Sequence, residues 1–258
     1  MKFATWNVNS LGVRLPQVLA WLQANPVDVL VLQELKMTDD KFPFDAFGQA
    51  GYSAHCFGQK TYNGVAMLSR HPASNVVRNI PGFADDLARV ISADVAGVRV
   101  IGGYFPNGQE PGSEKFEYKM SWLRALRHWL REELVRSPKL MLMGDFNITF
   151  DDADVWDPVA LYETIHCTEQ ERYELRALIA LGLHDAFRLF AQGPKSYSWW
   201  DYRDGGFRRN RGLRIDHILV SDALKPAVSN CFIDRSPRRN ERPSDHAPVL
   251  LELATAEP

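Results

Sequence analysis

Four short segments of this chain each run from an apolar, strand-like stretch into polar residues. They occupy residues 5–9, 32–34, 144–147 and 244–248. Polar groups at the ends of buried strands cost free energy unless they pair with one another, with a cation or with an anion. The chain must therefore fold so that several strands end around one shared polar site.

The polar side chains of these segments are of the kinds that a divalent cation and a phosphate need together. They are the carboxylates of Glu34, Asp145 and Asp245, the carboxamides of Asn7, Asn9 and Asn147, and the imidazole of His246. Mg2+ takes oxygen ligands and leaves room for substrate oxygens. Each segment alone is as readily an ordinary turn with a side-chain hydrogen bond. Four unrelated turns would not be expected to supply a complete set, so we favour a functional site.

The histidine of the last segment needs a carboxylate partner from another part of the chain. Side chains alternate faces along a strand, so Asp245 and His246 point to opposite sides if the segment is extended. The best candidate partner is Asp216, which lies in the strand-like run 213–220. By the same alternation His217 faces away from Asp216.

Taken in order, seven motifs resemble exonuclease III and the apurinic/apyrimidinic (AP) endonucleases. They are MKFATWNVNS at 1–10, LQELK at 32–36, YNGVA at 62–66, GYFPNG at 103–108, GDFN at 144–147, RGLRID at 211–216 and SDHAP at 244–248. GDFN and SDH alone would indicate only the wider superfamily that includes deoxyribonuclease I, sphingomyelinases and inositol phosphatases. The tryptophan-rich segment at residues 199–202 and RGLRID narrow the resemblance to the DNA-repair branch.

The resemblance implies a metal site and a substrate. Glu34, assisted by Asn7, would hold Mg2+, with Mn2+ as a substitute, and Asp245 would lie nearby, directly or through water. The substrate would be double-stranded DNA with nicked, recessed or damaged 3′ ends. The number of metal ions, one or two, is left open.

The resemblance also implies roles in phosphodiester hydrolysis. Asp145 would handle the nucleophilic water or the proton of the leaving group, and Asn147 would help to position the phosphate. His246, oriented by Asp216, would donate to a non-bridging phosphate oxygen, and Tyr104 would contact the phosphate. Whether Asp145 or His246 is the base is left open.

DNA contact is expected in spite of a formal net charge of −2, because local potential matters more than net charge. Arginines cluster late in the chain and alternate with aromatic residues, which suits phosphate contact and base stacking. The alternative is a solvated loop face. The expected DNA-contacting residues are Asn107, Trp199, Arg208, Arg209, Arg211 and Leu213.

His166 is a departure from the pattern of the resembled family, which tends to have a small residue there. It could be a surface histidine that precedes a helix. If it instead borders the DNA groove, its ring would obstruct a duplex that must bend to present an internal abasic site. We therefore expect His166 to influence specificity.

The periodicity of apolar residues predicts the scaffold. Helices are expected at 15–25, 114–135 and 171–183, and strands at 27–32, 140–143, 213–220 and 249–253, with two more around the turn at 96–97 within 89–104. Strands in both halves with helices between them indicate two sheets packed face to face. This agrees with the α/β fold that the resemblance implies, a four-layered α/β sandwich of two mixed β-sheets flanked by helices.

Length and composition are compatible with one domain over residues 1–258. No apolar run is long enough to span a bilayer, and no signal-type segment is present, so we expect no membrane partner. Cys56, Cys167 and Cys231 are odd in number and have no metal-type spacing, which favours reduced thiols in the cytoplasm. We expect a monomer.

The predicted function is metal-dependent hydrolysis of phosphoester bonds at DNA 3′ ends, as 3′-5′ exonuclease and 3′-phosphatase or phosphodiesterase, with AP endonuclease activity in addition. One alternative is AP endonuclease as the main activity. Another is a phosphatase of the same superfamily acting on a lipid or inositol phosphate, which the tryptophan and arginine segments disfavour. A silent DNA-binding relative would be expected to lack Glu34, Asp145, Asp216 or His246, and all four are present.

Overall fold

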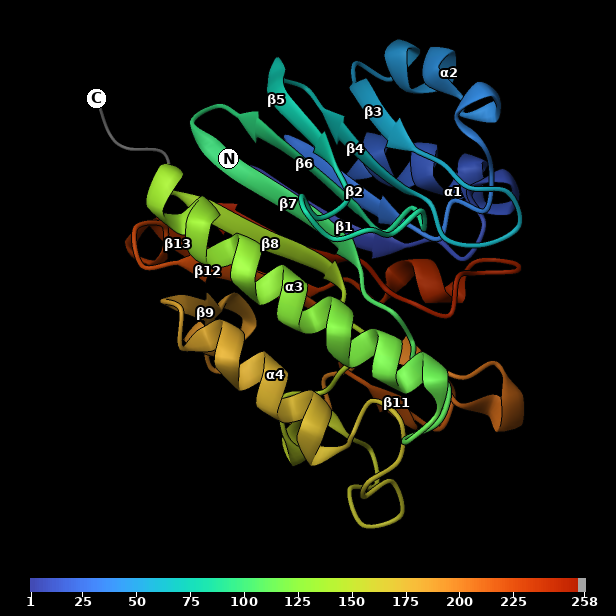
Figure 1. Cartoon of the computed structure of the whole chain (residues 1–258). Coiled ribbons are helices and arrows are strands. Elements are labelled where there is room, and N and C mark those ends of the chain that lie inside the picture. Colours follow the sequence, from blue (N-terminus) through green and yellow to red (C-terminus); the bar gives the residue numbers. More distant parts are fainter. Residues whose placement is uncertain (255–258) are drawn as a thin grey trace.

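Two six-stranded sheets pack face to face in the computed structural model, which describes residues 1–254 (Figure 1). The first sheet has the strand order β13-β14-β1-β2-β4-β3. Its strands are β1 (Lys2–Asn7), β2 (Val29–Gln33), β3 (Ser53–Phe57), β4 (Val65–Ser69), β13 (Val228–Ile233) and β14 (Val249–Leu253).

The second sheet has the order β5-β6-β7-β8-β12-β9, and a separate two-stranded ribbon pairs β10 with β11. Their strands are β5 (Ala73–Arg78), β6 (Val90–Val95), β7 (Val98–Tyr104), β8 (Leu140–Asp145), β9 (Leu183–Asp185), β12 (Asp216–Ser221), β10 (Trp199–Trp200) and β11 (Gly212–Leu213).

Within residues 1–254, four α-helices lie outside the sheets: α1 (Leu11–Ala24), α2 (Phe44–Gln49), α3 (Glu114–Arg136) and α4 (Glu169–Ile179). Short 3-10 turns occur at Asp39–Lys41, Asp152–Asp154, Ala186–Leu189, Arg203–Gly205, Lys225–Ala227 and Ser236–Arg239. Among the described residues, none of the helices combines the length and apolar character needed to cross a bilayer.

Each sheet contains one parallel pair at its centre, and the other pairs are antiparallel. β1 pairs with β2 in parallel and β7 with β8, while α1 and α3 are the crossover helices between them. Parallel strands require such crossovers, and they end at the same edge of their sheet. Because β1 also contacts β8 across the interface, the carboxyl ends of both pairs come together.

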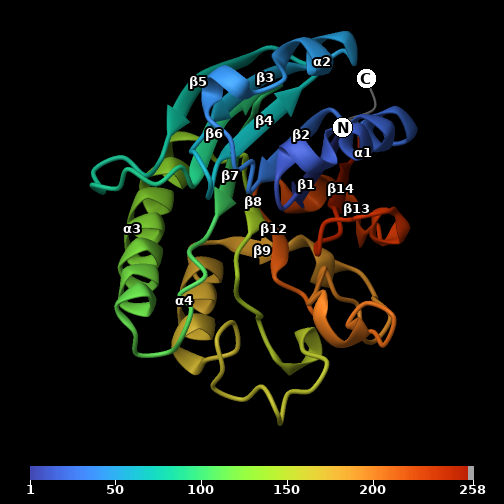
Figure 2. The ribbon, with the colours of Figure 1, turned by 90° about the vertical axis from the view of Figure 1, so that its right-hand side faces the viewer.

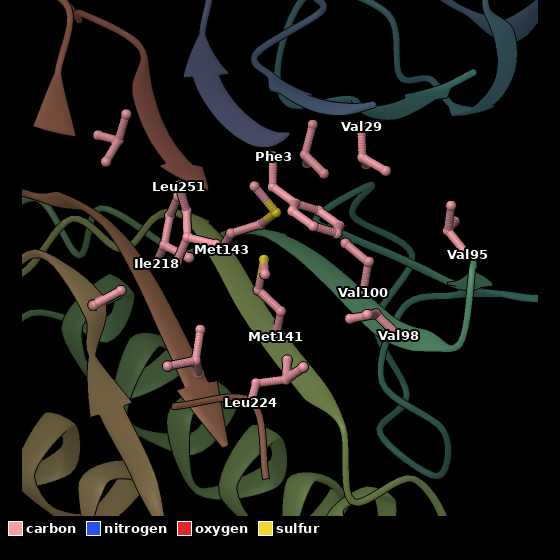
Figure 3. Close-up of a cluster of buried hydrophobic side chains, with 14 of the residues drawn as sticks. Phe3, Val29, Val95, Val98, Val100, Met141, Met143, Ile218, Leu224 and Leu251 are labelled. Carbon is pink, nitrogen blue, oxygen red and sulfur yellow. The ribbon is translucent and has the colours of Figure 1, made fainter. Parts of the chain in front are cut away.

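Three apolar layers hold the sandwich together. The middle layer joins the two sheets through side chains such as Phe3, Val29, Met141, Met143 and Ile218, all buried (Figure 3). The outer layers lie between the first sheet and α1 with α2, and between the second sheet and α3 with α4 (Figure 2). The predicted four-layered α/β sandwich is therefore confirmed.

Three predicted element boundaries are wrong. The first helix begins at Leu11, four residues before its predicted start at residue 15, and includes Pro16. α4 ends at Ile179, because Gly182 adopts a φ of +93° and turns the chain into β9. The predicted strand 213–220 is divided between β11 and β12, since Arg214 leaves the ladder to bind two buried carboxylates.

His217 on β12 is a buried neutral histidine. Its Nε2 lies 2.8 Å from the Ile148 carbonyl oxygen and its Nδ1 lies 3.1 Å from an Arg214 nitrogen. Burial, reinforced by the Arg214 charge, lowers the pKa of His217 to about 4. Since the folded pKa lies below the ordinary value of 6.5, His217 favours folding at neutral pH, and this contribution is lost as pH falls from 6.5 towards 4.

We predict that His217→Gln makes the stability of the protein less sensitive to acid. The wild-type histidine should cost about 2 kcal/mol at pH 5 relative to neutral pH, whereas glutamine does not titrate. The measurement is the free energy of urea unfolding at pH 7 and pH 5, with exposed His128→Gln as the control. Equal pH dependence in wild type and His217→Gln would contradict the assignment.

Candidate active site

The predicted polar residues meet at the edge where the parallel pairs end. Asn7 ends β1, Glu34 follows β2, Tyr104 ends β7 and Asp145 ends β8. At Gly144 the backbone has a φ of +155°, and a Cβ atom there would lie only 1.9 Å from the carbonyl oxygen of β7 opposite. Glycine is therefore required for β8 to bring Asp145 against its neighbour.

Asn7 joins the two carboxylates of this edge. Its Nδ2 donates to Glu34 Oε1 and to Asp145 Oδ2, each at 2.8 Å. Its Oδ1 accepts the backbone N–H of Asn9 at 2.9 Å, which fixes the orientation of the carboxamide. Asn7 therefore holds strand ends from both sheets in one hydrogen-bonded group.

His246 lies between two carboxylates. Its Nδ1 is 2.8 Å from Asp216 Oδ2, as predicted, and its Nε2 is 3.7 Å from Asp145 Oδ2. Asp216 also accepts from the Ser198 hydroxyl at 2.6 Å. Burial by itself lowers the pKa of His246, but attraction to Asp216 and Asp145 outweighs it and raises that pKa to about 10. The imidazole is therefore protonated at neutral pH.

Asp145 and Asn147 form the second part of the group. Burial raises the pKa of Asp145, with Asp216 and Glu34 adding to the rise, although His246 opposes it. Asn147 has a left-handed φ of +52°, and its backbone N–H donates to Asp145 Oδ1 at 2.9 Å. Its carboxamide donates to the Phe105 carbonyl at 3.1 Å, so Asn147 is held from both sides.

Side chains that could hold a metal ion lie together at the same edge. One ligand atom each from Glu34, Asp145 and His246 lies within 4.8 Å of the others. A protonated imidazole does not bind a cation, so the available ligands are oxygens, as a hard divalent cation requires. Lys36 Nζ lies 3.0 Å from Glu34 Oε2, the carboxylate oxygen that Asn7 does not bind.

Asp245 lies apart from these three side chains. Its oxygens accept from Asn9 Nδ2 at 3.0 Å and from Trp199 Nε1 at 2.9 Å. Burial alone would raise the pKa of Asp245, but His246 and these two donors hold it below its usual range. A contact with the metal, direct or through water, stays a prediction for this residue.

Tyr104 borders the carboxylates of Glu34 and Asp145. Burial raises the pKa of its hydroxyl well above the ordinary value, and the charges of Glu34 and Asp145 add to the rise. The Arg89 guanidinium lies 5.3 Å from the centre of the Tyr104 ring and also binds the Tyr104 carbonyl. The hydroxyl therefore stays protonated and able to donate.

A cavity of about 630 Å³ adjoins the site through two of its lining residues, Trp199, which donates to Asp245, and Asn107, which donates to Asn147. Its walls include Asn107, His166, Trp199, Arg211 and Leu213, five of the residues expected to contact DNA or set specificity. Arg208 and Arg209 are not brought to this cavity, and Arg209 is exposed on the adjoining loop.

The structure excludes a surface position for His166. The side chain is buried, its Nδ1 lies 2.6 Å from the Asn147 carbonyl oxygen, and its ring is 6.3 Å from that of Trp199. The segment before α4 turns inward, because the His166 backbone N–H donates to the buried Glu171 carboxylate. His166 is therefore a wall of the cavity, with an unusual φ of +73°.

Several residues of the site were not predicted. Lys36, Arg89 and Ser198 contact Glu34, Tyr104 and Asp216 respectively, and Lys119 contacts the Asn147 carbonyl. For Lys119 a signal exists, since a charged residue stands among the inward-facing apolar positions of a long amphipathic helix. The other three have no comparable pattern in the sequence.

The chain is similar to known proteins in sequence and in fold. The Endonuclease/Exonuclease/phosphatase family matches residues 4–246. Exodeoxyribonuclease III of Haemophilus influenzae is 37% identical over 266 residues, covering 98% of this chain and 100% of that protein. NExo of Neisseria is described as a 3′ phosphatase in a structure with a product DNA hairpin, and as a 3′-5′ exonuclease in another. It superimposes on this chain with a TM-score of 0.97 at 49% identity. The match covers 99% of this chain and 100% of NExo. An AP endonuclease of Archaeoglobus fulgidus gives a TM-score of 0.95 at 35% identity, again over 99% and 100% of the two chains.

We predict that Glu34→Gln weakens binding of a divalent cation. Mg2+ should raise the melting temperature of the wild type, because a ligand of the folded state at ten times its dissociation constant stabilises by about 1.4 kcal/mol. The variant should lose most of that increase, since a neutral amide replaces a charged ligand. Calorimetric scans with increasing Mg2+ measure the effect, and exposed Glu132→Gln is the control. The same increase in both variants would remove Glu34 from the cation site.

We predict that Asp216→Asn lowers the pKa of His246 by at least ~1 unit, because an opposite charge at this range shifts a pKa by about 1–3 units. NMR titration of the imidazole resonances in the metal-free protein gives the value. Asp222→Asn, beside His184 at the surface, is the matched control and should leave His246 unchanged. If His246 titrates identically in both variants, Asp216 does not govern its charge.

Proposed function

The chain belongs to the endonuclease/exonuclease/phosphatase family, and we propose that it hydrolyses phosphoester bonds at DNA 3′ ends. The proposed substrates are duplexes with nicked, recessed or damaged 3′ termini, from which it removes nucleotides or a 3′ phosphate. The observation that carries the proposal is the contact of Asp145 with both Asn7 and His246, near a cavity lined by Trp156 and Trp199. We further propose that residues 1–258 act as one domain and as a monomer.

The residues of the chain would divide the chemistry between them. Mg2+, with Mn2+ as a substitute, would neutralise phosphate charge when bound by Glu34, assisted by Asn7. His246 faces a carboxylate on either side, so it would donate from Nε2 to a non-bridging phosphate oxygen. Asp145 would then be the group that receives a proton from the attacking water.

Asn147 and Tyr104 would complete the phosphate site. The Asn147 carboxamide is restrained by the Phe105 carbonyl and by Asn107 Nδ2, which lies 3.3 Å from its Oδ1. The protonated Tyr104 hydroxyl would donate to the phosphate. Donors that are held in place before the substrate arrives stabilise developing charge without a cost of reorganisation.

The cavity beside the carboxylates would receive the terminal nucleotide of the damaged strand. Trp199 and Leu213 supply apolar surface, and the Arg211 guanidinium, 4.9 Å from the Trp156 ring centre, supplies positive charge. Aromatic rings stack on any base, which suits a strand of any sequence. Arg208 and Arg209 would contact phosphates farther along the duplex.

AP endonuclease is the second candidate, favoured by the similarity to the Archaeoglobus fulgidus protein. An internal abasic site differs from a 3′ end because the duplex continues on both sides and must be bent to reach the carboxylates. The buried His166 ring occupies part of the cavity wall where such a bent strand would pass. We propose that His166 disfavours internal sites for this steric reason.

We predict that the wild type with Mg2+ acts on a 3′ phosphate at a nick and on a recessed 3′ hydroxyl at least ~10-fold faster than on an internal abasic analogue. About 1.4 kcal/mol of extra duplex deformation would produce that ratio. His166→Gly should raise abasic cleavage selectively, and glycine suits the φ of +73° at this position. Initial rates on the three labelled duplexes give the comparison.

Two variants make this assay specific. Asp145→Asn should lose at least ~100-fold on every duplex, which excludes a contaminating nuclease. Glu163→Gly changes another positive-φ residue of the same segment, φ +55°, that is exposed and is not among the residues lining the cavity, so its ratio of rates should match the wild type. Equal rates on all three wild-type duplexes and no response to His166→Gly would make AP endonuclease the better description.

A further inference from the structure

Lys119 is a buried ammonium next to the active site. It lies on the inner side of α3 with none of its side chain exposed. Its Nζ contacts the carbonyl oxygens of Asn107 at 3.0 Å and of Asn147 at 2.8 Å, and Glu171 Oε1 at 2.5 Å. An ammonium group has three N–H donors, so these three acceptors use all of them.

The two carbonyl groups belong to residues whose side chains face the site. Asn107 follows β7 and Asn147 follows β8, and their carboxamides are 3.3 Å apart. Neither carbonyl lies within a strand, and Asn147 holds a left-handed φ of +52°, which asparagine tolerates. No strand ladder fixes these two carbonyl groups, so the contact with Lys119 is available to orient them.

Glu171 links the same ammonium to the wall of the cavity. Its Oε1 also accepts the His166 backbone N–H at 3.2 Å, and its Oε2 accepts from Thr168, the capping residue of α4. His166 Nδ1 in turn contacts the Asn147 carbonyl oxygen that Lys119 binds. One buried ion pair therefore touches the loop after β7, the loop after β8 and the segment before α4.

Stability alone does not account for this pair. Replacing a buried ion pair by apolar residues of similar volume is often neutral or stabilising, so such pairs are weak evidence of a contribution to folding. Arg99 and Glu133, 2.8 Å apart on β7 and on the other half of α3, form a buried pair that touches none of the active-site residues. The Lys119–Glu171 pair therefore differs from the Arg99–Glu133 pair in that it contacts the backbone of active-site residues.

We propose that Lys119, paired with Glu171, is a positioning residue that fixes the Asn107 and Asn147 backbones so that both carboxamides face the substrate phosphate. The proposal rests on the proposed function of the site. Lys119 does not reach the phosphate itself, because its three donors are already used. It acts through Asn147, and its removal should alter turnover more than substrate affinity, since small errors of position cost about 100-fold in rate.

The test compares two charge-removing double variants. Lys119→Met with Glu171→Gln removes the pair beside the site and keeps its volume, whereas Arg99→Met with Glu133→Gln removes the distant pair. Steady-state rates on a nicked duplex with a 3′ phosphate should show kcat reduced at least ~10-fold in the first variant, with KM changed less. The second variant should retain the kcat of the wild type. Equal reductions in both would assign Lys119 to stability alone.

A mutant cycle with Asn147→Ala tests the route of the effect. If Lys119 acts mainly through Asn147, adding the Lys119 and Glu171 substitutions to Asn147→Ala should lower kcat by a smaller factor than in the wild type, because only the contribution of Asn107 remains. Fully additive losses would contradict the proposal.

A readout without substrate separates this proposal from the proposed function. The side-chain amide resonances of Asn107 and Asn147 in the full chain should shift or broaden in the variant that lacks Lys119 and Glu171, while that of distant Asn75 stays unchanged. Wild-type protein inactive on DNA would refute the proposed function, whereas unchanged Asn107 and Asn147 resonances would refute the positioning role whatever the activity.

Discussion

The shared hydrogen bonds of Asn7 to Glu34 and Asp145 are the contact on which the rest of the site depends. Two carboxylates this close repel each other, and burial adds a cost for each charge. The carboxamide of Asn7 and the imidazolium of His246 offset that cost by contacting the carboxylates. These contacts form only if the strand ends of the two sheets lie close enough for their side chains to meet. The apolar layer between the sheets and the glycine at 144 provide that closeness.

A second buried network delivers Asp216 to the same point. Arg214 is 1% exposed and binds Asp154 at 2.7 Å and Asp185 at 2.7 Å, which interrupts the strand pattern directly before β12. Asp216 therefore begins a strand instead of lying within one, opposite Asp145 in the ladder. A carboxylate at a strand end can face the site, whereas one within the ladder would face the core or the helices.

The sequence predicted those parts of the structure in which the pattern is local. Alternation along strands predicted that the carboxylate partner of His246 is not Asp245, and the candidate named for that place, Asp216, does contact His246; helical spacing identified α3 almost to its ends. It failed at α1, where the apolar spacing predicted a start at residue 15 although the helix begins at Leu11, and at the run 213–220, where a distant pair of aspartates decides the conformation. The burial of His166 likewise depends on Glu171, which lies in the next helix, and no local pattern reveals that contact.

The residues for the chemistry and the residues for selecting the substrate lie in different parts of the fold. The residues that would bind the cation and activate water stand at the ends of strands, which the packed sheets hold rigidly. Apart from Asn107, which follows β7, the cavity walls come from segments between β8 and β12 that lie outside the main ladders. A substitution such as His166→Gly can therefore change the shape of the cavity while the carboxylates stay in place. The Lys119–Glu171 pair couples the cavity wall to the strand-end residues, because it binds both Asn147 and the segment that carries His166.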